Sequence, residues 1–474
     1  MRTSERPKDA RALVVIFIGL NLGMLLSTLD GTIVATALPS ITADIGGVSG
    51  ITWVVTAYLL AQIATMPLYG KLGDVYGRKW VFLVAVGVFT LGSMLCGVSQ
   101  SLEQLVGARA LQGLGAGGLG PLSMAILGDL VPPRQLGRWL GYQGAIFAVG
   151  GVAGPLAGGL FVDYLSWRWA FFFNVPVALF SMALVATNLK VPYRRVAHSI
   201  DYLGSALLTG ALVALVLVTT AGGRSIPWVS PQAAALVLVI VVLAALFVRR
   251  ERSASEPFVP IRLFTNAVVR MVNALNFTSG LLFYCGIFFL PVFLQEVRGV
   301  SPTTSGALLI PFMTATALAT LVAGRRVETT GRYRVWPIVG SALMTIGVAL
   351  MATLGLGSPV GLGAAFAAVL GTGIGFVMQT SLLALQNRVE GADLGIATST
   401  VLLTRTLGGT VGTALFGAVL AAGLPAHGAT RTDYADALPI VFLVAVPFGL
   451  LALVAALRLQ EHPLRDHAHF TPPA

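Results

Sequence analysis

The chain has 474 residues, of which 56% are hydrophobic and only 10% are charged, and its mean hydropathy is +0.85. A soluble globular domain carries about a quarter of charged residues, so the composition excludes that class and predicts a protein with many membrane spans. The net charge of +11 comes from basic residues in short loops without interleaved aromatic residues. We therefore expect the lipid bilayer, and no nucleic acid, as the partner of this chain.

Fourteen apolar segments follow one another along the chain, each roughly 18 to 25 residues long, the length that crosses a hydrocarbon core of ~30 Å. They begin near residues 11, 50, 80, 102, 137, 168, 202, 231, 269, 305, 335, 360, 398 and 438. Arginine and lysine concentrate in every second connection, which predicts that these connections and both termini are cytoplasmic. The first segment is too long for the apolar part of a signal peptide, so we expect it to remain as a span.

The fifth apolar segment is unusually rich in glycine. It reads GYQGAIFAVGGVAGPLAGG from Gly141 to Gly159. Glycine destabilises an isolated helix, so we attribute its density to close packing between helices, with a bend at the Gly-Pro pair. We interpret the segment as a seam whose packing opens and closes. The seam residues are Gly141, Gly150, Gly154, Pro155, Gly158 and Gly159.

Two patterns of the first half return in the second half at nearly the same offset. The first pattern matches Leu136-Gly137, Gly150-Gly151 and Gly154 with Leu394-Gly395, Gly408-Gly409 and Gly412. The second matches the loop that begins at Gly70 with Gly324, Glu328, Gly331 and Arg332. Internal repeats are typical of transporters that move two halves around a central site. We therefore predict a six-helix bundle in residues 1–190, two additional helices with a linker in 191–268, and a second six-helix bundle with a short tail in 269–474.

The loop between the second and third segments reads GKLGDVYGRK and carries a charged pair. Asp74 precedes Arg78 by four positions, a spacing that allows an ion pair if the loop continues into helix. A solvated pair of little energetic value is the alternative. We interpret the loop as a latch on the inner face, whose ion pairs hold one conformation and release in the other. Its residues are Gly70, Gly73, Asp74, Gly77, Arg78 and Lys79.

Asp30 is the only acidic residue that lies well inside an apolar segment. A carboxylate within a membrane is costly and is by default a functional candidate. Arg109, in the fourth segment, lies at a similar depth, so the two side chains can pair. We predict a protonation site, because burial disfavours the charged carboxylate and the arginine favours it. A static buried ion pair is the alternative.

Polar side chains inside other apolar segments are candidates for a substrate cavity, because a mostly apolar pocket with few polar groups suits amphipathic organic molecules. These candidates are Tyr58, Gln62, Gln112, Gln143, Tyr284, Gln379 and Arg405. Each of the polar side chains is as compatible with hydrogen bonds between helices as with ligand contact. Arg405 has no acidic residue nearby in the sequence, and snorkelling or bonding to carbonyl groups is its alternative role.

Other chemistries are not indicated. The chain has no GxxxxGK[ST] phosphate-binding loop, its histidines lie in loops or in the C-terminal tail, and Cys96 and Cys285 are far apart within apolar segments. We therefore expect no metal, no cofactor and no enzymatic activity, with a proton gradient as the energy source.

Several of these motifs resemble those of the major facilitator superfamily. GKLGDVYGRK is similar to the loop motif of the superfamily, and Gly141–Gly159 is similar to the antiporter motif of its exporters. LDGTIVATALP, RALQGLGAG, WRWAFFFNVP and EPFVPIRLF resemble segments of its fourteen-helix drug:proton antiporter family. The resemblance implies an all-α polytopic fold with fourteen transmembrane helices, and it supports Asp30 and Arg109 in proton coupling.

From the residues and the resemblance together, we predict a proton-coupled antiporter that exports hydrophobic or amphipathic compounds such as drugs and antibiotics by alternating access. An exporter dedicated to one metabolite, lipid or antibiotic is the first alternative. A non-transporting receptor is less favoured, since it would be expected to carry a sizeable soluble domain. Abundant Ala and Gly with Arg in excess of Lys are typical of a GC-rich bacterial genome. We expect a monomer in the bacterial plasma membrane.

Overall fold

The computed structural model describes residues 6–45, 52–189, 201–221, 230–253, 262–390, 393–425 and 430–464. Within these ranges the secondary structure is helical. The helices are α1 (Arg6–Ile45), α2 (Thr52–Tyr76), α3 (Arg78–Val98), α4 (Leu102–Leu130), α5 (Pro133–Tyr164), α6 (Trp169–Phe172), α7 (Asn174–Asn188), α8 (Tyr202–Ala221), α9 (Pro231–Ser253), α10 (Arg262–Thr265), α11 (Ala267–Val292), α12 (Pro302–Ala307), α13 (Ile310–Thr330), α14 (Val335–Met351), α15 (Val360–Arg388), α16 (Leu394–Gly423) and α17 (Arg431–Arg458). A π-helical segment, Phe293–Val297, extends α11.

Every predicted apolar segment is occupied by helix. The sixth is divided between α6 and α7, and the tenth between α12 and α13. Among the described residues, ten helices are long and apolar enough to cross a membrane, and two shorter apolar helices lie at Leu203–Leu215 and Val335–Met351. The prediction of an all-helical membrane protein is confirmed.

Local signals in the sequence define where several helices begin and end. The Ser101 hydroxyl accepts a hydrogen bond from the backbone N–H of Gln104 and caps α4. Thr430 and Asp433 form a reciprocal capping box at the start of α17. Gly77, with φ 91°, separates α2 from α3, and Gly331, with φ 71°, ends α13. Only glycine adopts these left-handed conformations without strain, so both turns depend on glycine.

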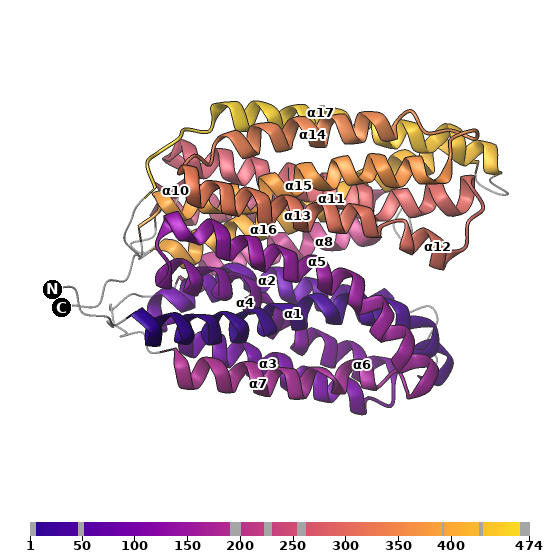
Figure 1. The fold of residues 1–474 in the computed structure, drawn as a ribbon. Coiled ribbons are helices and arrows are strands. Elements are labelled where there is room, and N and C mark those ends of the chain that lie inside the picture. The colour runs from indigo at the N-terminus through magenta and orange to yellow at the C-terminus, as the bar shows by residue number, and fades with distance from the viewer. Residues whose placement is uncertain are drawn as a thin grey trace.

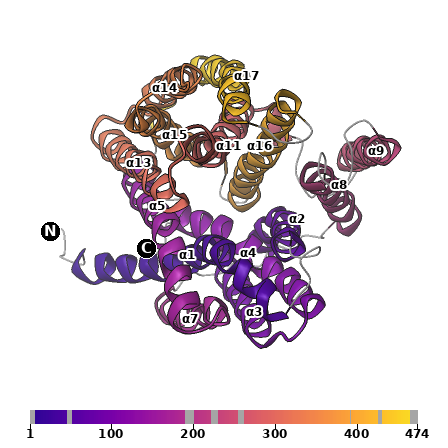
Figure 2. The same cartoon turned by 90° about the vertical axis from the view of Figure 1, so that its right-hand side faces the viewer.

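The helices form two groups that lie side by side (Figure 1). Helices α1 to α7 pack among themselves in one group, and α11 to α17 pack among themselves in the other. The start of α1 and the end of α17 lie at the same end of the molecule, here called the terminal end, and the opposite end is called the far end. Helix α8 packs against α2 and α16, and α9 packs against α8, so this pair lies beside the two groups (Figure 2).

The outer pair has the surface of a lipid-facing element. Large apolar side chains of α9 are exposed, including Val237 at 51% and Leu238 at 63%. In a bilayer such side chains contact acyl chains rather than water, so their exposure carries no penalty. At the terminal end, Arg250 donates a 2.9 Å hydrogen bond to the Asp201 carboxylate, which joins the end of α9 to the start of α8.

Each group is held together by close approach of small residues. A side chain at Gly115 of α4 would overlap the backbone of Phe89 on α3. In the other group, a side chain at Gly408 of α16 would overlap the carbonyl of Phe277 on α11. Close backbone contact increases dispersion attraction, which drives association where lipid replaces water. These glycines therefore let α3 meet α4, and α11 meet α16, at short distance.

Candidate functional site

A buried polar cluster surrounds Asp30 on α1. The side chain of Asp30 is 0% exposed and that of Arg109, on α4, is 1% exposed. Nη1 of Arg109 donates to Oδ2 of Asp30 at 2.5 Å. Oδ1 of Asp30 accepts hydrogen bonds from Nε2 of Gln112 at 2.7 Å and from Nδ2 of Asn174, on α7, at 3.1 Å. Three helices therefore converge on one carboxylate.

Arg109 is fixed by contacts besides its ion pair. Its Nε donates to the carbonyl of Val54 on α2 at 3.0 Å, and its Nη1 donates to Oε1 of Gln112 at 2.7 Å. The guanidinium carbon lies 4.1 Å from the ring centroid of Tyr58, a cation–π distance. The hydroxyl of Tyr58 in turn donates to the Ser27 carbonyl on α1. These contacts orient the cation toward Asp30.

The sequence prediction brought together Asp30 and Arg109 but placed Tyr58 and Gln112 in a substrate cavity. In the structure both side chains belong to the Asp30 cluster instead. Asn174 and Ser93 were not predicted at all. Nδ2 of Asn174 donates to Oγ of Ser93 at 2.9 Å as well as to Asp30. An amide inside the apolar run WRWAFFFNVP was the available signal for Asn174, since a polar group there requires a partner.

The hydrogen bonds around Asp30 fit a carboxylate, and one buried amide oxygen beside it has no partner among the described residues. In the observed arrangement the carboxylate oxygens only accept hydrogen bonds, which suits the ionised form. A protonated carboxyl needs an acceptor for its O–H group. Oδ1 of Asn174 is buried and has no hydrogen-bond partner within the described part of the chain. Rotating this amide by half a turn would present that oxygen to Asp30. The other titratable groups around Asp30 and Arg109 are Tyr58 and Cys96.

Asn174→Leu removes this adaptable amide while keeping a similar volume. If Asp30 is the proton-coupling site predicted from the sequence, efflux driven by a proton gradient should fall several-fold, because two hydrogen bonds to buried groups, each worth ~1 kcal/mol or more, are lost. Transport by the variant is compared with that of Asn188→Leu on the same helix, where the amide bonds only within its own helix, to Leu184 and Thr187. Equal efflux by the two variants would remove Asn174 from the site.

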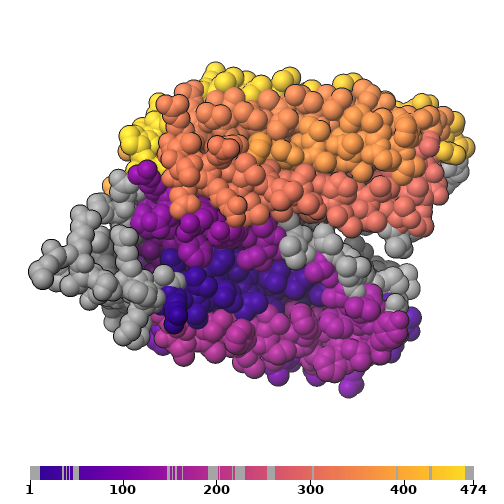
Figure 3. Space-filling model, in the orientation of Figure 1, coloured from indigo at the N-terminus to yellow at the C-terminus, as the bar shows by residue number. Residues whose placement is uncertain are grey.

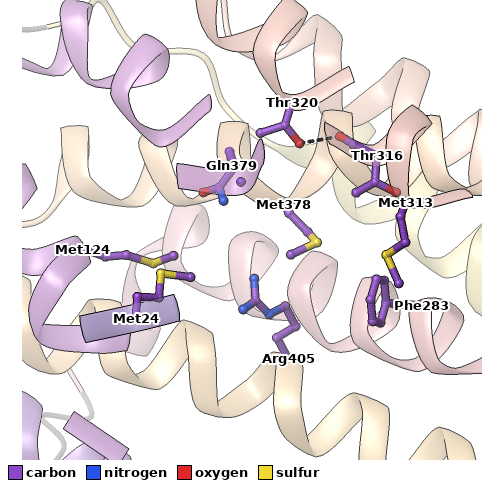
Figure 4. Close-up of a pocket in the computed structure, with 10 residues that line it drawn as sticks. Met24, Met124, Phe283, Met313, Thr316, Thr320, Met378, Gln379 and Arg405 are labelled. Atoms are coloured by element: carbon purple, nitrogen blue, oxygen red, sulfur yellow. Dashed lines mark hydrogen bonds between the residues drawn. The ribbon is translucent and has the colours of Figure 1, made fainter. Parts of the chain in front are cut away.

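A second feature is a small cavity between the two groups of helices (Figure 4). It holds about 20 Å³ and is lined by Met24, Met124, Gly144, Phe283, Met313, Thr316, Thr320, Met378, Gln379 and Arg405. A single water molecule needs a cavity of at least about 10–15 Å³. The cavity is therefore too small for an organic molecule, which would fit only after the lining residues move apart.

The predicted cavity residues divide by position. Gln379 and Arg405 line the cavity. Gln143 is 1% exposed, lies beside the lining residue Gly144, and neither polar atom of its amide has a hydrogen-bond partner among the described residues. Tyr284 packs on the rings of Phe283 and Phe288. Gln62 is half-buried on α2, and neither Gln62 nor Tyr284 is a lining residue.

At the terminal end, the GKLGDVYGRK segment joins the two groups of helices. Nη2 of Arg78 donates to Oδ1 of Asp74 at 2.6 Å, and Arg78 also pairs with Asp129 on α4. The carboxylate of Asp74 accepts backbone N–H groups of Gly395 at 3.1 Å and Ile396 at 3.0 Å, in the first turn of α16. A helix N-terminus favours an anion because its N–H groups are unpaired and its dipole is positive there.

The other residues of this segment have separate contacts. Gly70 lies against Ser399 and the carbonyl of Gly395 on α16, so a side chain would push the groups apart. Gly73 lies against Leu122 of α4. Lys79 donates to the carbonyl of Ala186 on α7 at 2.7 Å, so it bonds within its own group of helices.

The repeated motif forms a second junction between the groups, at α5 and α13. A side chain at Gly324 would overlap the carbonyl oxygen of Gly137, and one at Gly137 would lie 3.1 Å from the carbonyl oxygen of Gly324. Arg138 pairs with Glu328 at 3.3 Å. Glu328 thus contacts the opposite group, while Arg332, four positions later in the repeated motif, is exposed. The surfaces of the two groups meet here in the space-filling view (Figure 3).

The predicted glycine seam of α5 faces two neighbours. Gly141 lies against the backbone of Thr320 and Leu321 on α13. Gly150 packs against Leu25, and a side chain at Gly154 would overlap Thr32, both on α1. Gly158 is buried, whereas a side chain at Gly159 would meet nothing within 4 Å. Helix α5 continues past Pro155 to Tyr164.

The WRWAFFFNVP segment bonds to α1 through both ends of the motif, with Asn174 on Asp30 as described above, and with Trp167 and Arg168 on Asp44. At the far end, Nε1 of Trp167 donates to Asp44 at 2.9 Å and Nη1 of Arg168 donates at 2.7 Å. These hydrogen bonds hold the pKa of Asp44 below its usual range. The charged form of Asp44, and with it this contact, therefore persists at mildly acidic pH and is lost only as pH falls through that lowered pKa.

Comparison with known proteins gives a consistent result. The family model described as Major Facilitator Superfamily matches residues 20–202 and 197–413. An uncharacterised MFS-type transporter of Mycobacterium tuberculosis is 37% identical over 481 residues, covering 95% of this chain and 70% of that protein. Multidrug transporter protein MdtP of Bacillus subtilis is 34% identical over 443 residues, covering 93% of this chain and 81% of that protein.

A solved structure shares the fold. The proton:xylose symporter XylE superposes with a TM-score of 0.65 at 16% sequence identity, covering 95% of each chain. The matches to the family model span most of the chain, and the motif resemblance described above agrees with them. The chain belongs to the major facilitator superfamily and is a membrane transporter, not an enzyme.

Proposed function

We propose that this protein is a proton-coupled antiporter that exports hydrophobic or amphipathic organic compounds by alternating access. The observation that carries the proposal is the fully buried Asp30–Arg109 pair and its hydrogen-bond cluster. A buried pair of charges is seldom retained for stability alone, because removing both charges from water costs several kcal/mol. A carboxyl that gains and loses a proton gives such a pair a function.

The position of Asp30 relative to the cavity supports coupling. Met24 of α1 lines the cavity, and Asp30 lies about 9 Å further along the same helix toward the far end. In the proposed cycle, a proton that enters from the far end neutralises Asp30 and weakens its attraction to Arg109. The resulting change in the packing of α1 against α4 alters the affinity of the cavity for its substrate.

The terminal end supplies contacts that join the two groups of helices. Two junctions join the groups. One is the bond between Asp74 and the start of α16, and the other consists of the contacts Gly137–Gly324 and Arg138–Glu328 between α5 and α13. We propose that these contacts form the latch predicted from the sequence, and that they break when the terminal end opens to admit substrate. The part of the seam at Gly141 is then a moving surface against α13.

We further propose fourteen transmembrane helices with both termini in the cytoplasm, so that the terminal end is the inner face. The positive-inside distribution of Arg and Lys supports this orientation. Residues 1–190 and 269–474 would then be the two moving bundles, with 191–268 contributing the outer pair. The proposed location is the plasma membrane of a bacterium, and the proposed working unit is a monomer.

Efflux is favoured over uptake by two arguments. The motif in α5 resembles that of exporters. MdtP, whose alignment covers 93% of this chain, is named a multidrug transporter. An exporter dedicated to a single metabolite, lipid or antibiotic remains the second candidate. The soft lining of four methionines and one phenylalanine favours broad specificity, since thioether side chains adapt to different shapes.

The proposal is tested with inverted membrane vesicles whose lumen is made acidic. A lipophilic fluorescent dye is added outside the vesicles, and its accumulation in the lumen is measured. We expect the wild-type protein to concentrate dye in the acidic lumen and to lose this ability when an ionophore collapses the pH difference. Dye accumulation that is insensitive to the pH difference in these vesicles would contradict proton antiport.

A further inference from the structure

Arg405 differs from the buried arginines Arg78 and Arg109 in having no counter-charge among the described residues. Arg109 pairs with Asp30, and Arg78 pairs with Asp74 and Asp129. For the guanidinium of Arg405, the described residues provide no hydrogen bond and no ion pair. Its side chain instead extends into the cavity between the two groups (Figure 4).

Among the described residues, no acidic side chain pairs with Arg405: Asp30 of α1 pairs with Arg109, and Asp129 of α4 pairs with Arg78. The helices α11, α15 and α16 contain no acidic residue. On α13 the acidic residue is Glu328, which pairs with Arg138 at the terminal end. Tyr284 is the titratable side chain that lies near Arg405. An isolated cation in a membrane interior is costly, so a protein that keeps one has a use for it.

Snorkelling does not account for this arginine. Long basic side chains reach the membrane surface when they lie near a helix end. Arg405 lies roughly 16 Å along the helix axis from the start of α16 at Leu394. The side chain is half-buried and lines a cavity of about 20 Å³ at the centre of the molecule. Its charge therefore acts within the cavity.

The other lining groups define what an occupant would need. Met24, Met124, Met313, Met378 and Phe283 provide a soft apolar wall. The hydroxyl groups of Thr316 and Thr320 donate to carbonyl groups of helix backbone, which leaves their oxygens as acceptors. Arg405 and the amide of Gln379, on opposite sides of the cavity, remain as donors. This combination accepts an anionic head group with an apolar or aromatic body.

We propose that the cavity selects amphipathic organic anions and that Arg405 binds the carboxylate, or a chemically similar anionic group, of the exported compound. This proposal rests on the export function proposed above and specifies its substrate class. The planar guanidinium can bind both oxygens of a carboxylate. When no substrate is present, the guanidinium has no ion pair to break before it binds an anion.

The charge of the substrate also changes the energetics of exchange. If one monovalent anion leaves the cell as one proton enters, two charges cross in the same electrical sense. The membrane potential, negative inside, then drives export together with the pH difference. An exported anion should therefore respond more strongly to the potential than a neutral compound carried by the same protein.

The test compares two fluorescent probes with the same dansyl body, the carboxylate dansylglycine and its neutral amide dansylglycinamide. Each is titrated against the full-length protein in lipid nanodiscs. We expect the wild-type protein to bind dansylglycine at least about tenfold more tightly than the amide, the difference typical of one charged hydrogen-bonded contact. Arg405→Gln should bind the two probes equally, and Arg405→Lys should retain part of the preference.

A control variant separates this proposal from its alternatives. Arg270→Gln removes one positive charge from an exposed position at the terminal end and should keep the preference for the anion. Equal affinity of the wild-type protein for the two probes, no binding of either, or an unchanged preference in Arg405→Gln would each overturn the proposal.

Transport measurements show which proposal has failed. If vesicles accumulate neutral dye under a pH difference while the protein shows no preference for the anion, export stands and the anion site is wrong. If the protein prefers dansylglycine through Arg405 but no compound is moved by the pH difference, the site stands and proton-driven export is wrong.

Discussion

Asp30→Asn is expected to abolish accumulation against a gradient while leaving downhill movement of substrate through the protein. Asn has nearly the same shape but carries no exchangeable proton, so the inward proton step has no carrier. Because Arg109 would then be a buried cation without its counter-charge, we also expect a loss of stability of about 3–5 kcal/mol. Dye accumulation in inverted vesicles measures the first effect, and thermal unfolding of the purified protein measures the second.

Asp44→Asn is the matched control, since it neutralises another aspartate of α1. Its side chain is exposed at the far end and contacts Trp167 and Arg168. Exposed ion pairs contribute little to stability, so this variant should accumulate dye as the wild-type protein does. Undiminished gradient-driven accumulation by a folded Asp30→Asn protein would show that the proton is carried elsewhere.

Gly324→Leu is expected to force the terminal end open. Any side chain at this position would overlap the carbonyl oxygen of Gly137 on the opposite group of helices. Densely packed interfaces do not absorb added atoms without displacement, and here the displacement separates α5 from α13. We expect transport to be lost, because a conformation in which this end is closed becomes inaccessible.

The opening can be measured between spin labels at the terminal end. Trp80→Cys on α3 and Val335→Cys on α14 provide exposed sites, at 63% and 51% exposure, in opposite groups. The native Cys96 and Cys285 are both buried and should not be labelled. The label-to-label distance should lengthen in Gly324→Leu and stay unchanged in Gly417→Leu, where a side chain meets nothing within 4 Å. An unchanged distance in a folded Gly324→Leu protein would contradict the latch.

Much of the fold follows from simple properties of the sequence. Continuous apolar segments of membrane-crossing length predict helices because backbone groups in lipid must bond within the segment. Loop glycines such as Gly77 and Gly331 mark the breaks between them. The depth of Asp30 and Arg109 along their helices was sufficient to predict that they could pair, since helical rise relates sequence position to depth.

The remaining site residues depend on information that a single sequence does not contain. Depth is readable from sequence, but the direction of a side chain around its helix depends on which neighbours the helix packs against. Gln112 was therefore assigned to the cavity although it faces Asp30, and the contact of Glu328 with Arg138 on α5 was not predicted. The cavity methionines are equally hidden, because Met24 and Met378 look like ordinary core residues.

The coupling of substrate and proton can be measured directly in proteoliposomes that contain the purified protein and a pH-sensitive dye. An imposed substrate gradient, with no initial pH difference, should drive protons in the opposite direction, so that the side losing substrate becomes acidic. The same gradient should move no protons in Asp30→Asn. Substrate movement by the wild-type protein without a change in pH would contradict the proposal that this transporter exchanges its substrate for protons at Asp30.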